Sequence, residues 1–232
     1  MPRQAPALKA LDRFLDDLAA FSDPRVFNPW RDVDPVNDIG REAPDIRRDQ
    51  LRRYLSERIG HAKLLLVAEA AGYQGCKFTG LAMTSERQLL AAGPLDDTHF
   101  AGDKRRTSRE SVKPPGFNEP TATIVWGRML EAGLRGQEWV NWNTFAWHPF
   151  EGRALSNRTP TRQELEAGAP VLARFLALFP GVPVVTVGEK ARGKLGELGV
   201  EALAAVRHPA YGGATEFGEG IGRVLSGLRG RR

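Results

Sequence analysis

Three short polar segments carry side chains that can donate or accept hydrogen bonds or protons. They centre on Glu69, Asn143 and His208, and each lies at the end of a short apolar run. A carboxylate, an amide and an imidazole together supply acceptors, donors and a titratable ring. In open α/β sheets, ligands bind beyond the carboxyl ends of the parallel strands. If the apolar runs are such strands, the sequence predicts a ligand site built from these three segments.

The elements that must position these segments alternate along the chain. Strands are expected at 63–68, 139–145, 182–187 and 203–207, from continuous apolar runs or from alternation with aromatic residues. Helices are expected around them, at 6–21, 44–59, 84–90, 121–134, 161–179, 188–198 and 214–229. This alternation predicts an α/β fold, a three-layer α/β/α sandwich around a central four-stranded parallel sheet. Residues 95–118 are expected to form a long, polar and basic loop.

The composition excludes several classes of site. The 232 residues contain a single cysteine, Cys76, which rules out an internal disulfide, an iron–sulfur cluster held by four thiolates and a cysteine-rich zinc site. The four histidines lack the spacing of a metal motif, so we expect no metal and no cofactor. No apolar stretch approaches the roughly 18 residues of a membrane span, which favours a cytoplasmic protein without a membrane partner. The net charge of +5 suits a polyanionic partner such as nucleic acid.

The segment that contains Glu69 resembles the first active-site motif of the uracil-DNA glycosylase superfamily. Iron–sulfur-type members of that superfamily read G-E-A-P-G there, and Glu69, Ala70 and Gly72 match, whereas Ala68 and Ala71 replace a glycine and the proline.

Two further segments strengthen the resemblance. His208-Pro-Ala is similar to the H-P-S or H-P-A motif of the superfamily, and Asn143 stands where the superfamily places its base-reading asparagine. The resemblance spans roughly residues 60–225. It implies a uracil-DNA glycosylase-like domain over 61–232, with residues 1–60 as a helical extension packed on the core.

The resemblance implies a catalytic role for each of the three polar residues. Asn143 complements the O4 and N3–H edge of uracil. His208 donates a hydrogen bond to uracil O2, which gains charge as the N-glycosidic bond breaks. Many members activate water with an aspartate at the position of Ala70. Because this chain has an alanine there, Glu69 is the nearest carboxylate in the motif. The alternatives are that Glu69 caps a loop, Asn143 satisfies a turn and His208 is structural.

The resemblance also implies base-binding and DNA-binding residues. Met83 stands where the superfamily has an aromatic residue that stacks on the base, and Phe78 or Phe145 could do the stacking instead. Tyr211 stands where the superfamily often has a leucine that wedges into the DNA. Met83 could equally be packing, and the basic run 104–109 could be solvated surface. The expected base-binding residues are Ala70, Gly72, Tyr73, Met83 and Phe78, and the expected DNA-binding residues are Ser85, Arg105, Arg106, Arg207 and Tyr211.

The function that the resemblance implies is that of a monofunctional DNA glycosylase. It would hydrolyse the N-glycosidic bond of uracil, or of a related deaminated base flipped out of single- or double-stranded DNA. We expect a monomer in the cytoplasm, associated with the nucleoid. One alternative is a protein of the same fold that binds DNA or damaged bases with little or no glycosylase activity. Another is an unrelated α/β enzyme acting on nucleotides or esters, but the sequence has no G-x-S-x-G or phosphate-loop pattern.

Overall fold

A computed structural model describes residues 4–91, 95–96 and 98–230 of the chain. Its centre is a four-stranded sheet in which every strand pair is parallel. The strand order is β3 (Trp139–Phe145), β2 (Leu64–Ala70), β5 (Val184–Val187), β6 (Ala204–Val206). The four-stranded parallel sheet predicted from the sequence is therefore confirmed, with each strand within a few residues of its expected place.

The sheet is buried on both faces, which explains why its strands are nearly continuous apolar runs. All residues of β3 and β5 are buried, and so are the first five of β2. The register pairs Ala68 with Asn143 across β2 and β3, and Val187 with Val206 across β5 and β6. Because the strands are parallel and in this register, the segments that follow them emerge at one edge of the sheet.

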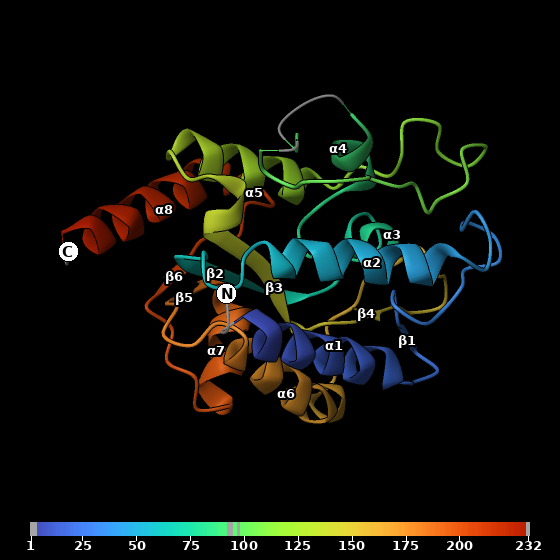
Figure 1. Cartoon of the computed structure of the whole chain (residues 1–232), viewed down its shortest axis with the longest axis horizontal. Helices are drawn as coiled ribbons and strands as arrows, with labels where there is room; N and C mark the ends of the chain where they lie inside the picture. Colours follow the sequence, from blue (N-terminus) through green and yellow to red (C-terminus); the bar gives the residue numbers. More distant parts are fainter. Residues whose placement is uncertain (1–3, 92–94, 97, 231–232) are drawn as a thin grey trace.

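Helices cover the two faces and make the fold three-layered (Figure 1). Helices α1, α6 and α7 lie on one side of the sheet, and α5 and α8 lie on the other. Helix α6 packs on β3, α7 packs on β2 and β5, and α8 packs on β6 and on α5. The helices are α1 (Gln4–Ala20), α2 (Ala43–Ser56), α3 (Cys76–Thr79), α4 (Glu86–Leu90), α5 (Pro120–Glu131), α6 (Arg162–Ala177), α7 (Glu189–Glu197) and α8 (Ala214–Arg229).

Helix α2 covers the outer edge of β3, where a strand would otherwise offer unpaired backbone groups. The hydroxyl oxygen of Tyr54 accepts a hydrogen bond of 2.8 Å from the backbone N–H of Asn141, and Arg58 Nε donates to the carbonyl of Trp139 at 3.1 Å. Apolar residues of α1 and α2, including Phe14 and Leu51, belong to the same core cluster as the sheet. The domain boundary at residue 60 stays a prediction.

The sequence did not reveal a second, two-stranded sheet. Here β1 (Val26–Phe27) pairs antiparallel with β4 (His148–Pro149), which follows directly after β3. The long loop before α5 is also tied to the body of the protein. The buried carboxylate of Glu86 accepts hydrogen bonds from the backbone N–H groups of Thr107 and Ser108 at 2.7 and 2.9 Å. One part of that loop is therefore buried, which its polar composition did not predict.

Candidate active site

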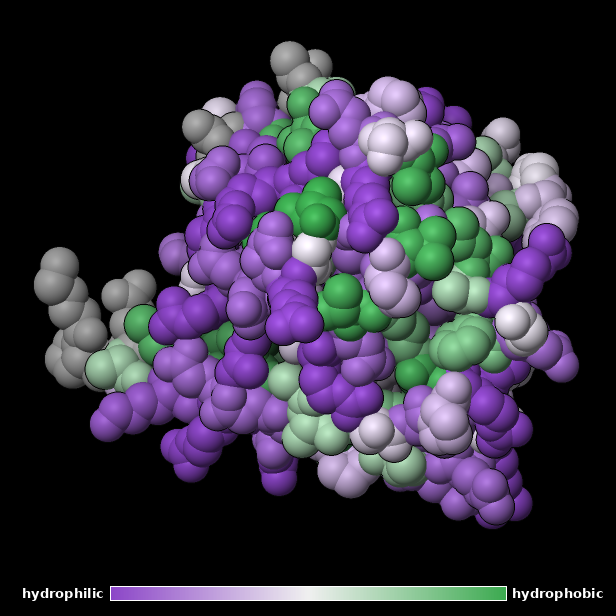
Figure 2. All heavy atoms as spheres, turned by 90° about the vertical axis from the view of Figure 1, so that its right-hand side faces the viewer, coloured by the Kyte–Doolittle hydropathy of each residue, from purple (hydrophilic) through white to green (hydrophobic). Residues whose placement is uncertain are grey.

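A large cleft of about 1240 Å³ opens at the carboxyl ends of the strands. It takes residues from the ends of β2, β3, β5 and β6, the arrangement expected for a ligand site in an open parallel sheet. In Figure 1 the arrow of β3 points to the right-hand side of the molecule, and Figure 2 shows that side. On this face, separate apolar patches lie between hydrophilic groups (Figure 2).

The cleft brings together most of the residues singled out in the sequence. Glu69, Asn143 and His208 all line it, although they come from β2, β3 and the segment after β6. Five other expected contact residues also line it: Ala70, Gly72, Met83, Arg207 and Tyr211. The sequence motifs therefore converge in space, while the roles assigned to them stay predictions.

Asn143 is held in β3 with its amide turned to the cleft. Asn143 as a whole is only 3% exposed, yet it lines the cleft. In the part of the chain that the structure describes, its side-chain amide has no hydrogen-bond partner, unlike that of the neighbouring Asn141, whose Oδ1 accepts from Trp139 Nε1 at 3.1 Å. Buried amides are ordinarily hydrogen-bonded. An unpartnered donor and acceptor at the wall of a cleft is therefore suited to a polar ligand edge.

The backbone fixes the tautomer of His208. The N–H of Ala210 donates to His208 Nδ1 at 3.1 Å. Because that nitrogen accepts, the proton of the neutral ring lies on Nε2. Burial, with a smaller contribution from the charge of Arg207, lowers the pKa of His208 from its ordinary value. The ring is therefore neutral at pH 7 and offers one donor, Nε2–H.

Glu69 is engaged at both its backbone and its side chain. Its carbonyl accepts a hydrogen bond of 2.6 Å from Thr144 Oγ1, and its Oε2 lies 3.5 Å from Lys190 Nζ. The carboxylate therefore has a cationic partner at the start of α7.

Two residues of the cleft adopt the left-handed backbone region, which is uncommon for residues other than glycine. Met83 has a φ of 45° and is buried at the cleft wall. Tyr211 has a φ of 54° and is 99% exposed, the largest exposure among the big apolar and aromatic side chains. Strained backbone is found at functional sites more often than elsewhere. The turn holds the Tyr211 ring in solvent at the mouth of the cleft.

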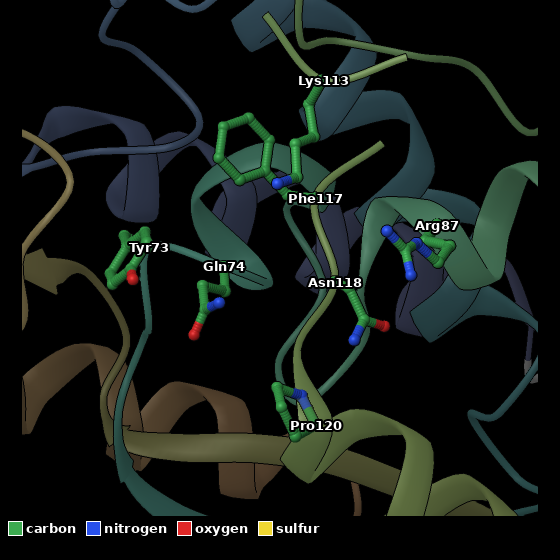
Figure 3. A pocket seen from close by; sticks show the side chains of 7 residues that line it. All are labelled: Tyr73, Gln74, Arg87, Lys113, Phe117, Asn118 and Pro120. Atoms are coloured by element: carbon green, nitrogen blue, oxygen red, sulfur yellow. The ribbon is translucent and has the colours of Figure 1, made fainter. Parts of the chain in front are cut away.

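A smaller hollow of about 360 Å³ adjoins the cleft and shares Gln74 and Pro120 with it. Tyr73, another expected base-binding residue, lines this hollow. Figure 3 shows the side chains that line this hollow, which come from residues 73–74, from helix α4 and from the segment 113–120 that leads into α5. Arg87 and Lys113 supply positive charge there, and neither forms an ion pair with an acidic residue that the structure describes.

Four expected contact residues lie in neither hollow. Phe78 is fully buried and stacks on Phe117 at a centroid distance of 4.0 Å. Ser85 is also fully buried and caps α4, where it forms a capping box with Gln88. Arg106 donates to the carbonyls of residues 113 and 114 within its own loop, and Arg105 is exposed outside the cleft lining.

The structure adds two polar cleft residues that sequence reasoning missed, Glu119 and Asn157. Glu119 occupies the N-cap position of α5, just before Pro120, but its side chain makes no capping bond. Asn157 Oδ1 accepts from the backbone N–H of Tyr73 at 3.1 Å and so ties down the first motif. No local signal in the sequence identifies either contact.

Within residues 4–91, 95–96 and 98–230, no group of three or more His, Cys, Asp or Glu side chains is arranged to hold a metal ion. Within the same residues, no helix is both long enough and apolar enough to cross a membrane.

Comparison with known proteins gives a likeness in structure but none in sequence. No protein-family model matches the chain, and no curated protein matches it. A crystal structure of wild-type SMUG2 from Pedobacter heparinus matches with a TM-score of 0.65 at 11% sequence identity, covering 95% of this chain and 98% of that chain. At this identity the likeness concerns the fold alone. The chain thus has a uracil-DNA glycosylase-like α/β/α fold, with its cleft at the carboxyl edge of the sheet.

Proposed function

We propose that the protein is a monofunctional DNA glycosylase that hydrolyses the N-glycosidic bond of uracil, or of a related deaminated base, flipped out of DNA. The observation that carries the proposal is that Asn143 and His208 line the same cleft. One has an unpartnered amide, and the other has a single donor fixed by the backbone. They stand at the two edge strands of the sheet, with β2 and β5 between them. Adjacent strands are about 4.8 Å apart, so the gap can accommodate a base between the side chains.

The two residues divide recognition and catalysis between them. The Asn143 amide accepts from N3–H and donates to O4 of uracil, an edge that cytosine does not offer. The His208 Nε2–H donates to O2, where negative charge develops as the bond to the sugar breaks. A fixed neutral donor therefore stabilises the transition state more than the ground state.

DNA would reach the cleft along its rim. The exposed ring of Tyr211 can occupy the place left by the flipped base, and Arg207, which also lines the cleft, can contact a phosphate. The hollow with Arg87 and Lys113 can hold a phosphate of a neighbouring nucleotide. The partner that we propose is thus single- or double-stranded DNA bound by a monomer.

The test uses oligonucleotides that contain uracil, hypoxanthine or xanthine, both single-stranded and mispaired. Wild-type protein should generate alkali-labile sites on at least one of them. His208→Ala should lower the rate by about 100-fold or more, because a donor to the developing charge is lost. His61→Ala, at an exposed position outside the cleft, is the matched control and should retain full activity. Absence of product from every substrate would refute the proposal.

A second candidate function is favoured by one residue. Ala70 stands where many members of the superfamily carry the water-activating aspartate, so the cleft could hold a base without cutting its bond. DNA affinity that weakens with salt, together with no base release, would favour this binding function.

A further inference from the structure

The cleft contains one carboxylate without a charged or hydrogen-bonded partner, that of Glu119. Its Oε2 is enclosed by protein and has no hydrogen-bond partner among the described residues. Its Oε1 also has no hydrogen-bond partner among these residues. Unlike Oε2, it is not fully buried, and Glu119 lines the cleft. Glu69, in contrast, is paired with Lys190. Buried polar groups are ordinarily satisfied, so this exception requires an explanation.

Two glycines lie beside this carboxylate, Gly75 and, in the first motif, Gly72. A Cβ at Gly75 would lie 1.8 Å from Glu119 Oε2, so any larger residue at position 75 would displace the carboxylate. At Gly72 the situation is different. A Cβ there would lie 3.9 Å from Glu119 Oε1 and 4.0 Å from Asn157 Nδ2, which is ordinary contact without a clash. The space beside Gly72 is therefore open and flanked by an acceptor and a donor.

That space fits a water molecule. Asn157 Oδ1 is used by the N–H of Tyr73, so its Nδ2 remains free to donate. Glu119 Oε1 and Asn157 Nδ2 lie 3.9 and 4.0 Å from the same Cβ position, so a water in the cleft beside Gly72, farther from the backbone than that position, can reach both side chains. Such a water would lie beside the first motif, in which Ala70 stands where many other members of the superfamily carry a water-activating aspartate.

We propose that Glu119 is the general base of the hydrolysis and that, with Asn157, it holds the attacking water beside Gly72. This inference rests on the proposed glycosylase function. The water oxygen forms a bond to C1′ of the flipped nucleotide, and the C1′–N1 bond breaks. The electron pair of that bond leaves with the base, whose O2 is stabilised by His208. The proton of the water passes to the Glu119 carboxylate, and the product is an abasic site.

The electrostatics of the site agree with this role. Burial raises the pKa of Glu119 to about 7, so the carboxyl group can take up and release a proton near neutral pH. Cys76 interacts electrostatically with Glu119; burial and the charge of Glu119 raise the pKa of its thiol, which therefore stays neutral. His148, behind the first motif, is neutral because burial lowers its pKa to about 4. The other titratable or charged groups around the cleft are Glu69, Arg158, Glu189, Lys190, Arg207, His208 and Tyr211.

The experiment is single-turnover excision from a uracil-containing oligonucleotide between pH 5.5 and 9. The wild-type rate should rise through about pH 7 to a plateau, because the base must be ionised. The pKa of His208 is lowered by burial, so its titration lies on the acid side of the Glu119 inflection, and Glu119→Gln distinguishes the two groups. Glu119→Gln should remove the inflection and lower the rate at pH 8 by about 100-fold. Far-ultraviolet circular dichroism and the melting temperature establish that the variant is folded.

A pair of glycine variants tests the water position without touching the carboxylate. In Gly72→Ala the methyl group occupies the open space, and the rate should fall at least tenfold with little change in Tm. Gly127→Ala in α5 is the matched control, because a Cβ there meets nothing within 4 Å, and its rate should equal that of the wild type.

The possible outcomes separate the two proposals. An active wild type whose inflection persists in Glu119→Gln overturns the role of Glu119. The same conclusion follows if Glu69→Gln, rather than Glu119→Gln, removes the inflection. A wild type that releases no base from any oligonucleotide overturns the proposed function and this inference with it.

Discussion

Two histidines at the strand ends have lowered pKa values for the same reason, burial, but their surroundings differ. His208 lines the cleft with one nitrogen tied to the backbone and the other available as a donor. His148 is fully enclosed in β4, with Nδ1 at 3.1 Å from the carbonyl of Ala71 and Nε2 at 3.4 Å from that of Ala154. The first is therefore suited to a ligand, whereas the second anchors the first motif to β4.

At the residue scale, His148 should make the protein sensitive to acid. Its pKa is about 4 when folded and about 6.5 when exposed, because burial disfavours the charged ring. Between these values the unfolded chain binds more protons, so stability falls as the pH decreases from about 6.5 to 4. The loss is about 3 kcal/mol for the full shift. It should appear as a pH-dependent decrease in the free energy of unfolding, measured with urea.

His148→Asn removes the titrating group while its amide can still donate to the carbonyl of Ala71. Its free energy of unfolding should therefore change by about 2–3 kcal/mol less between pH 7 and pH 4.5 than that of the wild type. The exposed His61→Asn variant should keep the wild-type dependence. Equal pH dependence in His148→Asn and wild type would contradict the assignment.

At the element scale, the main structural device is the covering of β3 by α2. Strand β3 carries Asn143, and its outer edge has no neighbouring strand in the four-stranded sheet. Side chains of α2 and of the turn after it satisfy the backbone groups of that edge, through Tyr54 and Arg58. The N-terminal segment therefore contributes to the rigidity of the strand that presents the base-reading candidate.

Tyr54→Phe tests this covering. Removing the hydroxyl leaves the buried N–H of Asn141 without an acceptor, which should lower the free energy of unfolding by about 1–3 kcal/mol. Tyr211→Phe makes the same chemical change at a side chain that is 99% exposed, and it should alter stability by less than about 0.5 kcal/mol. Chemical denaturation of both variants gives the comparison. Equal stabilities would mean that the Tyr54 hydroxyl does not support the edge.

At the scale of the whole molecule, the net charge is +5, and the cations that contribute to it differ in whether they form ion pairs. Several cations are used within the fold, such as Lys77 with Asp34 at 3.0 Å and Arg47 with Asp38 in the interior. Others near the cleft, namely Arg87, Lys113 and Arg207, form no ion pair within the described part of the chain. Part of the positive charge that remains for a polyanion therefore lies at the cleft and its adjoining hollow.

The double variant Arg87→Ala/Lys113→Ala should weaken DNA binding and make it less dependent on salt. Each lost phosphate contact reduces the slope of log K against log salt by about 1. Fluorescence anisotropy at several NaCl concentrations measures both quantities. Lys9→Ala/Arg13→Ala on α1 removes the same charge from exposed positions outside both hollows, and it should keep the wild-type slope. Equal slopes in the two double variants would contradict a phosphate site in the hollow.

The elements and the strand-end segments could be predicted because their signals are local. Apolar runs of four to seven residues marked the sheet, and each of the three motifs lies within a few residues of a strand end. The parallel arrangement then required Glu69, Asn143 and His208 to meet at one edge. Helix α4 likewise begins two residues after its predicted start at residue 84, because Ser85 caps it locally.

Tertiary structure alone decided what each side chain contacts. Glu119 and Gly75 lie in separate segments, and the carboxylate reaches the first motif only because α5 and α3 are packed as they are. Phe78 and Arg106 have the residue types of a binding site, but packing directs one into the core and the other into its own loop. Local sequence determines which elements form, through hydrophobic periodicity and turn chemistry. Contacts between distant segments depend on how the whole core packs, so they emerge only once the chain has folded.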